Sequence, residues 1–267
     1  MGSRKSDFSE CYIKRRINSE IKKLFQFPAT VSAIIIIWII LHYASGSPAI
    51  PKLSDVLKAI KQLPFNEKFT EHLWSTTKIL FKGILTGATA GFILGVICDI
   101  SNIAKAVING VVHFIRGIPA IALFPLILAI LGIGDESRIA VIIWTAFPPV
   151  FISTVFGMDS VSSDVIGAAS LDGADRTRIA LQIKIPVSIC EILNGLKIAI
   201  GTGFISVVTA EMLGANKGIG YMILWSTNAF KYSEVYAYIF VVAVMGFIMS
   251  AVVDLITKFV EKRIFNV

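Results

Sequence analysis

Long apolar stretches that carry almost no charge run through this chain from about residue 27 to residue 256. The 267 residues are 55% hydrophobic and 16% charged, whereas about a quarter of the residues in a soluble domain are charged. A helix of about 20 apolar residues crosses the hydrocarbon core of a bilayer. The sequence therefore predicts an all-α, polytopic membrane protein.

Six transmembrane helices are expected. They cover approximately residues 27–43, 70–97, 118–133, 139–156, 186–213 and 235–256. Residues 1–26 form a polar segment with seven Lys and Arg, which the positive-inside rule assigns to the cytoplasm. Six spans return the C-terminus to the same side, and fifteen Lys and Arg then lie inside against seven outside. The predicted transmembrane domain is 27–267, with its core at 70–257.

Two features flank the first apolar stretch. Ala44, Ser45 and Gly46 follow it, as small residues also follow a secretory signal peptide. We interpret the stretch as an uncleaved anchor, because about 26 mostly polar residues precede it and the remaining chain is itself apolar. The segment SDVLKAIKQL, residues 54–63, has apolar residues at helical spacing. This spacing predicts a short amphipathic helix at the outer surface.

Composition also indicates which chemistries to exclude. The net charge of +7 does not indicate a nucleic-acid partner, because many of the basic residues lie in the N-terminal segment. Cysteines and histidines are scattered, at Cys11, Cys98, Cys190, His42, His72 and His113, without the spacing of metal ligands. No GxxxxGK[ST] phosphate loop is present. We therefore expect neither an enzyme nor a cofactor in this chain, and any ATP to be bound by a partner.

Glycine recurs at every fourth position of the second span, at Gly83, Gly87, Gly91 and Gly95. Residues four apart share one helix face, so this glycine stripe lets another backbone approach closely. We expect it to serve helix packing, with a sliding surface for conformational change as the alternative. On the packing interpretation, leucine at Gly91 should disrupt assembly, whereas alanine should be tolerated with a modest loss.

Prolines mark the third span. Pro119 suits a first helical turn, and Pro125 should kink the helix or end it. The polar interval 159–185 follows the fourth span and contains DVIGAASLDGADRTRIALQIKIP. Asp164 can cap a helix there, and Gly173 interrupts the pattern where a turn between two short helices would fall. Small exposed side chains on such helices favour docking into a groove of another protein, with a plain connecting loop as the alternative.

This interval resembles the loop motif of binding-protein-dependent ABC importer permeases. The motif has two alanines after a glutamate, a glycine four residues beyond the second alanine, and an apolar-x-apolar-Pro ending. The matching residues are Ala168, Ala169, Gly173, Ile183, Ile185 and Pro186. The sequence departs from the motif at Gly167, which stands in place of the glutamate, and at Asp172, which precedes the glycine. The resemblance implies that this loop, including Ala174, forms a coupling helix seated in a cleft of an ATPase.

The resemblance extends from about His72 to the C-terminus. RGIPAIALFPLILAILGIG and GLKIAIGTGFISVVTAEMLGANKGIGYMI are similar to the aliphatic sulfonate, taurine and nitrate permeases. Membership implies a type I ABC importer permease fold in the bacterial cytoplasmic membrane. The implied partners are two copies of an ATPase that binds ATP and Mg, an extracytoplasmic binding protein, and a second permease copy. The simplest assembly that encloses a path between two permease copies is a homodimer.

Two charged residues of the fifth span are candidates for the substrate pathway. Lys197 lies eleven residues past Pro186, roughly 16 Å into the span. An interior cation would favour an anionic solute such as a sulfonate. Alternatively, Lys197 snorkels to the inner surface or pairs with a carboxylate such as Glu191. Glu211 ends the span near the outside, where it acts as a gate or docking residue or as a satisfied structural carboxylate.

Two other function classes compete with the importer. A secondary transporter or channel would act without an ATPase and would usually show inverted repeats or intramembrane acidic residues. The predicted spans hold almost no carboxylates, with Asp254 the main exception. A membrane-embedded enzyme would need clustered catalytic groups, and none is evident. An importer of a small, anionic solute is therefore the favoured function.

Overall fold

The computed structural model describes residues 32–265. The chain divides into two units, Met1–Lys58 and Ala59–Val267, each described here by itself. Ser32–Ser45 forms an apolar helix in the first unit. The indole of Trp38 donates a 3.1 Å hydrogen bond to the carbonyl of Pro51, so this helix is tied to the segment that follows it. Part of the predicted first span, and the whole of segment 1–26, lie outside the described residues.

Every regular element described in the second unit is helical. The helices are α3 (Glu67–Ile100), α4 (Asn102–Ile115), α5 (Ala120–Leu131), α6 (Asp135–Asp159), α7 (Ser163–Leu171), α8 (Arg176–Ile179), α9 (Ile185–Gly214), α10 (Ile219–Asn228) and α11 (Tyr232–Phe265). A π-helical turn, Ala180–Lys184, joins α8 to α9. The amphipathic segment forms α2 (Leu53–Gln62), which crosses the boundary between the units. The prediction of an all-α protein is confirmed.

Among the described residues, four continuous helical segments are long and apolar enough to cross a membrane: Lys68–Ile100, Asp135–Asp159, Arg176–Gly214 and Tyr232–Arg263. Each contains one predicted span, although the third begins upstream because α8 runs through the π-helical turn into α9. The predicted span 118–133 differs more. Its helix, α5, is 12 residues long and follows α4, a helix the sequence did not predict, after a bend of 97°. Counting this pair as one broken span gives five.

The bend between α4 and α5 follows from its residues. Proline disfavours helical geometry in the residue before it, so Ile118 cannot continue α4 easily, and Pro119 becomes the extended N-cap of α5. Pro125 lies inside α5, which continues to Leu131. Of the two alternatives expected for Pro125, a kink or an end of the helix, the end is therefore wrong, because the flanking apolar residues keep the helix going around one missing hydrogen bond.

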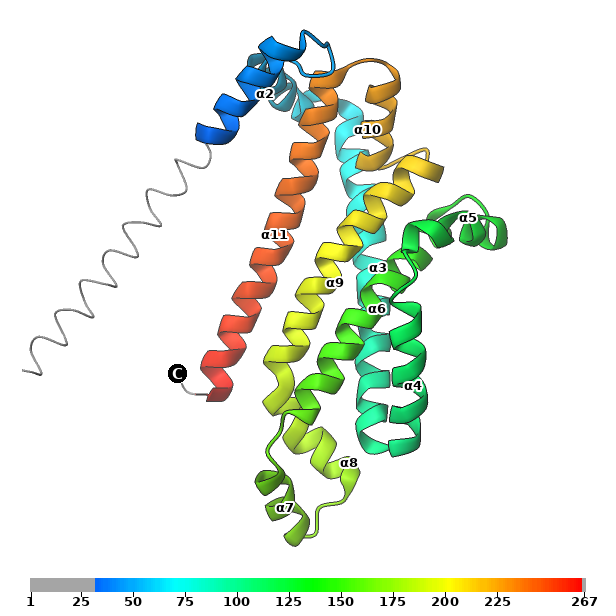
Figure 1. The fold of residues 1–267 in the computed structure, drawn as a ribbon, viewed down its shortest axis with the longest axis vertical. Coiled ribbons are helices and arrows are strands. Elements are labelled where there is room, and N and C mark those ends of the chain that lie inside the picture. Colours follow the sequence, from blue (N-terminus) through cyan, green and yellow to red (C-terminus); the bar gives the residue numbers. More distant parts are fainter. Residues whose placement is uncertain (1–31, 266–267) are drawn as a thin grey trace, which may run out of the picture. The chain divides into compact units, whose positions relative to one another are not determined.

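Helices α3, α6 and α9 form the core of the second unit, with α10 and α11 against α9 (Figure 1). The glycine stripe lies where α3 meets α6. A Cβ built on Gly91 would lie 2.6 Å from the carbonyl oxygen of Phe147, and one on Gly87 would lie 3.0 Å from that of Ile143. Only glycine allows the two backbones to approach so closely.

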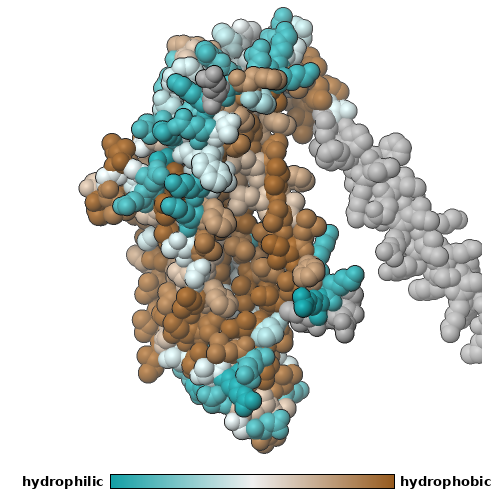
Figure 2. Space-filling view, turned by 180° about the vertical axis from the view of Figure 1, so that it is seen from behind, coloured by the Kyte–Doolittle hydropathy of each residue, from teal (hydrophilic) through white to brown (hydrophobic). Residues whose placement is uncertain are grey.

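The lateral surface of the helices is mostly hydrophobic, and hydrophilic residues gather at the two ends (Figure 2). Large apolar side chains such as Phe247, Ile205 and Ile130 are at least 70% exposed. A surface of this kind suits lipid or another membrane helix rather than water. The hydropathy of the folded chain thus agrees with the membrane location predicted from the sequence.

Candidate functional site

Two short helices project from one end of the bundle, beyond the ends of α6 and α9 (Figure 1). Helix α7 begins after Ser162, whose Oγ accepts a 3.3 Å hydrogen bond from the backbone N–H of Asp164. Asp164 lies in the first turn of α7, so the expectation that it caps the helix is wrong, and Ser162 is the cap. Gly173 has φ +81° and forms the turn between α7 and α8, as its place in the pattern predicted. Asp175 caps α8.

The surface of α7 is open. None of its residues is buried, and Leu171 is 91% exposed. Gly167 and Gly173 have nothing within 4 Å of a built Cβ, and Ala168 is exposed while Ala169 and Ala174 are half-buried. An exposed leucine beside small side chains is an apolar knob with room around it, which fits a groove on another protein.

Both ends of the 159–185 loop are ion-paired to the corner between α3 and α4. Asp159 pairs with Lys105 at 2.5 Å, and Lys184 pairs with Asp99 at 2.6 Å. The second pair is largely buried, with side chains 14% and 7% exposed. A displacement of α7 and α8 would therefore pull on the start of α4 as well as on α6 and α9.

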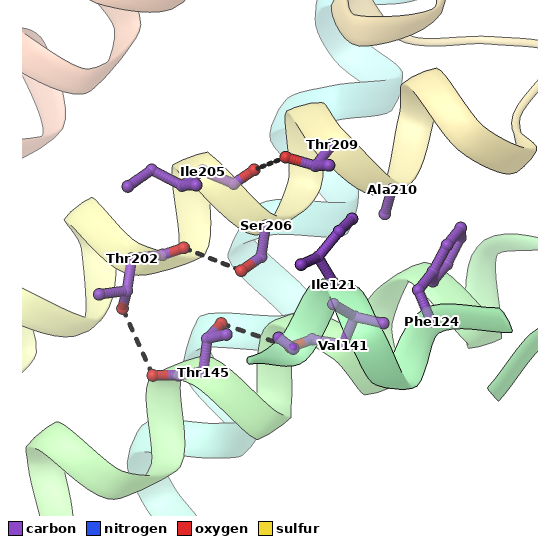
Figure 3. A pocket seen from close by; sticks show the side chains of 10 residues that line it. Ile121, Phe124, Val141, Thr145, Thr202, Ile205, Ser206, Thr209 and Ala210 are labelled. Carbon is purple, nitrogen blue, oxygen red and sulfur yellow. Dashed lines mark hydrogen bonds between the residues drawn. The ribbon is translucent and has the colours of Figure 1, made fainter. Parts of the chain in front are cut away.

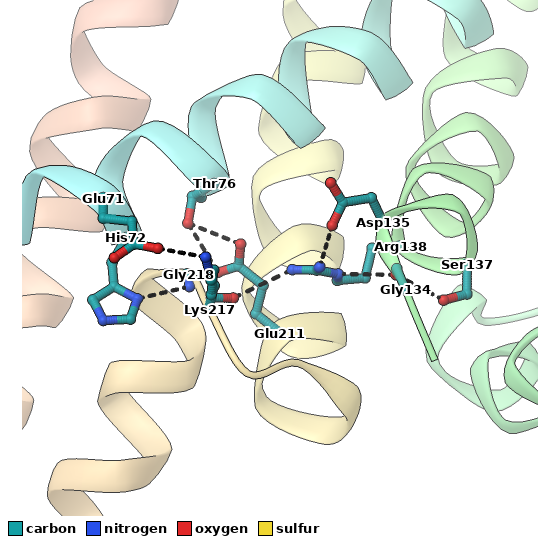
Figure 4. Close-up of polar contacts among 10 residues, drawn as sticks. All are labelled: Glu71, His72, Thr76, Gly134, Asp135, Ser137, Arg138, Glu211, Lys217 and Gly218. Carbon is teal, nitrogen blue, oxygen red and sulfur yellow. Dashed lines mark hydrogen bonds and ion pairs between the residues drawn. The ribbon is translucent and has the colours of Figure 1, made fainter. Parts of the chain in front are cut away.

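A buried polar network lies at the opposite end of α3 and α9 (Figure 4). Glu211 is fully buried and accepts hydrogen bonds from Thr76 Oγ1 at 2.8 Å and from the backbone N–H of Gly220 at 2.9 Å. Thr76 Oγ1 in turn accepts from the N–H of Ile219. The N–H of Gly218 donates to Nδ1 of His72. These bonds fasten the turn after α9 to the start of α3, and only Glu211 was singled out from the sequence.

Arg138 extends this network toward α6. It is 3% exposed, and its guanidinium donates to the carbonyls of Gly134 and Lys217 and to Asp135. The side chain of Lys217 pairs with Glu71 at 2.5 Å, and this hydrogen bond raises the pKa of Lys217. The turn 215–218 is thus held from both α3 and α6.

Lys197 pairs with Asp254 of α11 at 2.6 Å, and the two side chains are 44% and 50% exposed. The carboxylate partner proposed from the sequence, Glu191, is therefore not the one in the structure. Glu191 instead packs near Gly157, two residues from the end of α6 that precedes α7. A role of Lys197 in the substrate pathway stays a prediction.

Two adjoining cavities open on the face formed by α5, α6 and α9. One, of about 360 Å³, is lined by Arg116, Trp144 and the proline pair of α6 among others. The other, of about 230 Å³, is lined mainly by apolar side chains of α5 and hydroxyls of α9 (Figure 3). Thr145 and Thr202 line both cavities. Since Thr145 and Thr202 lie near the middles of α6 and α9, both cavities reach the centre of the bundle.

Comparison with known proteins gives several matches. Residues 87–266 match the family described as binding-protein-dependent transport system inner membrane component. The chain is 31% identical over 171 residues to the taurine transport system permease protein TauC of Escherichia coli, covering 64% of this chain and 61% of that one. It is 32% identical over 176 residues to the nitrate import permease protein NrtB of Leptolyngbya laminosa, covering 66% and 63%.

A third relative covers more of the chain. The putative aliphatic sulfonates transport permease protein SsuC of Bacillus subtilis is 24% identical over 229 residues, 85% of this chain and 83% of that one. Among solved structures, the inward facing MetNI methionine ABC transporter matches with a TM-score of 0.65 and 19% identity, over 74% of this chain and 98% of that chain. At this identity the likeness shows a shared fold.

Proposed function

This chain belongs to the family of binding-protein-dependent transport system inner membrane components, and we propose that two copies of it form the path of a small oxyanion across a bacterial cytoplasmic membrane. The relatives named for taurine, nitrate and aliphatic sulfonates support this class of solute. All three solutes carry one compact, negatively charged group with several oxygen atoms. A binding protein on the outer side would deliver the solute.

The proposal that ATP hydrolysis drives this transport rests on one observation, the pair of helices α7 and α8 that projects from the bundle. It is exposed, it carries the apolar Leu171, and it is tied at both ends to the corner between α3 and α4. We assign it to a cleft in a partner ATPase. Two permease copies would each engage one ATPase subunit, and those subunits would bind ATP and Mg.

Topology follows from this assignment. If α7 and α8 face the cytoplasm, the network around Glu211 lies at the outer end, where the binding protein would dock. Helix α11 ends on the side of the bundle that carries α7 (Figure 1), so on the same assumption the end of α11 would be cytoplasmic. Six spans in all would place the N-terminus there too, consistent with its seven basic residues.

Copurification from a mild detergent extract tests the proposal. The full chain, tagged and expressed in its own host together with any ATPase and binding protein that are encoded beside it, should retain the ATPase. Ala169→Arg, on the half-buried side of α7, should lose it, while Lys82→Ala, on the exposed side of α3, should not. A wild-type chain that never retains an ATPase yet still transports the solute would instead indicate a secondary transporter or channel.

A further inference from the structure

Arg116 is an unpaired cation in the break between α4 and α5. Within residues 32–265, no hydrogen bond or ion pair involves its guanidinium. By contrast, Lys105, Lys184 and Lys197 each pair with an aspartate. Nothing in the sequence distinguished Arg116 from these lysines.

The depth of Arg116 makes its lack of a partner important. It lines the larger cavity together with Pro148 and Pro149. Pro148 lies thirteen residues from the first residue of α6 and eleven from the last, or roughly 16 to 20 Å from either end of that helix. A cation at mid-depth is costly unless it faces water or an anion. The arginine is exposed to the cavity, so this condition is met only if the cavity contains water or an anion.

Hydroxyl groups line the smaller cavity (Figure 3), and those of Thr145 and Thr202 also line the cavity that holds Arg116. Thr202, Ser206 and Thr209 lie along one face of α9, and Thr145 faces them from α6. Each hydroxyl donates to a backbone carbonyl of its own helix, as Ser206 Oγ does to Thr202 at 3.0 Å. These bonds are easily exchanged, because a hydroxyl can rotate to donate to a ligand instead. The rest of the cavity wall is apolar. The three hydroxyls of α9, called the hydroxyl stripe below, therefore form with Thr145 the polar surface of the two cavities.

Among the described residues that line the two cavities, none is a carboxylate. Glu211 is buried in the outer network, Asp254 pairs with Lys197, and Glu191 lies near the inner end of α6. The natural counter-ion of Arg116 is then a solute.

We infer that Arg116 and the hydroxyl stripe of α9 bind a small monovalent oxyanion midway across the membrane. The inference rests on the proposed transport function and names the residue that selects the charge of the solute. A planar guanidinium can donate two parallel hydrogen bonds to two oxygens of a sulfonate or a nitrate. Ala120, the first residue of α5, lines both cavities, so the positive end of that helix adds to the attraction.

Charge-selective thiol modification tests the site without any partner protein. The full chain, with its three native cysteines replaced by serine or alanine, carries Thr202→Cys and is assayed in membrane vesicles. A sulfonate-bearing methanethiosulfonate should react faster than a trimethylammonium-bearing one. Arg116→Gln should lower the ratio of the two rates by about tenfold, as expected for one unit charge acting within a nanometre. Arg116→Lys should keep most of the ratio, and Lys197→Gln should leave it unchanged.

Protection identifies the ligand class. Millimolar methanesulfonate should slow modification of the introduced thiol, and the neutral analogue dimethyl sulfone should not. Arg116→Gln should abolish this protection. A rate ratio that Arg116→Gln leaves intact, or that Lys197→Gln lowers equally, would overturn the assignment, and so would a thiol that neither reagent reaches. These outcomes are independent of ATPase copurification, so failure of the anion site and failure of the transport function are separable.

Discussion

Lys184, the last residue before α9, lies 2.6 Å from the carboxylate of Asp99 near the end of α3, and the two side chains are only 14% and 7% exposed. The pair joins the end of the projecting loop to the helix that carries the glycine stripe. A buried ion pair is strongly destabilised when one partner is removed, because the other charge remains buried without compensation. The burial of this ion pair therefore predicts how reversing its charges will change the stability of the folded chain.

Lys184→Asp or Asp99→Lys alone should destabilise the folded chain by about 3–5 kcal/mol, since each places two like charges together out of water. The double exchange should recover most of the loss. The measurement is thermal unfolding in detergent, followed as loss of monodisperse protein. The exposed pair of Lys105 and Asp159 provides the control, because reversing one of its charges should cost at most about 1 kcal/mol. A double exchange no more stable than either single variant would contradict the account.

The close contacts of the glycine stripe in the structure lead to a sharper expectation than the sequence alone did. A Cβ on Gly91 would meet the carbonyl oxygen of Phe147 at 2.6 Å and the amide nitrogen of Phe151 at 3.0 Å. Backbone atoms cannot move aside as a flexible side chain does, so Gly91→Ala should already cost about 1–3 kcal/mol. The sequence-based expectation that alanine is tolerated with a modest loss is therefore revised to a larger loss.

Gly110 in α4 is the matched control for that variant, because nothing lies within 4 Å of its built Cβ. Gly110→Ala should be neutral or stabilising by up to about 1 kcal/mol, since alanine favours the helix. Yield in the membrane and melting temperature report both effects. Equal behaviour of the two alanine variants would show that α3 and α6 do not approach as closely as described.

The network around Glu211 should hold the turn 215–218. Glu211→Ala removes the acceptor of the Gly220 N–H and leaves a buried donor unsatisfied, which costs about 1–3 kcal/mol. Glu211→Gln keeps one oxygen acceptor and should lose less. Limited proteolysis at Lys217 in vesicles opened to the outer face measures whether the turn is released. Identical cleavage of wild type and Glu211→Ala would show that the carboxylate does not fasten the turn.

Local sequence signals predicted much of the fold and part of the site. The two short helices joined at Gly173 followed from small residues and a single interrupting glycine, which are local determinants of structure. Four of the expected spans correspond to long helices because their apolar stretches are continuous. Helix α4 was not predicted, because its apolar residues lie before the bend into α5 and Pro119 is the one sequence signal that marks this bend.

Contacts between distant segments could not be predicted in this way. Thr76 meets Glu211, and His72 meets Gly218, each across more than a hundred residues of chain, and no spacing rule relates these residues. The pairing of Lys197 with Asp254 rather than Glu191 is a similar case. Arg116 was overlooked because its importance lies in what surrounds it in space.

On the proposed function, α7 and α8 couple ATP hydrolysis in the partner to opening and closing of the path through this chain. The most direct measurement is ATP hydrolysis by the complete transporter in lipid nanodiscs, with and without the loaded binding protein. Wild type should show hydrolysis stimulated by the binding protein. In Ala169→Arg, the increase in hydrolysis rate caused by the loaded binding protein should be at least tenfold smaller, while the melting temperature stays within a few degrees of wild type. Full stimulation and full solute uptake by a folded Ala169→Arg variant would contradict the claim.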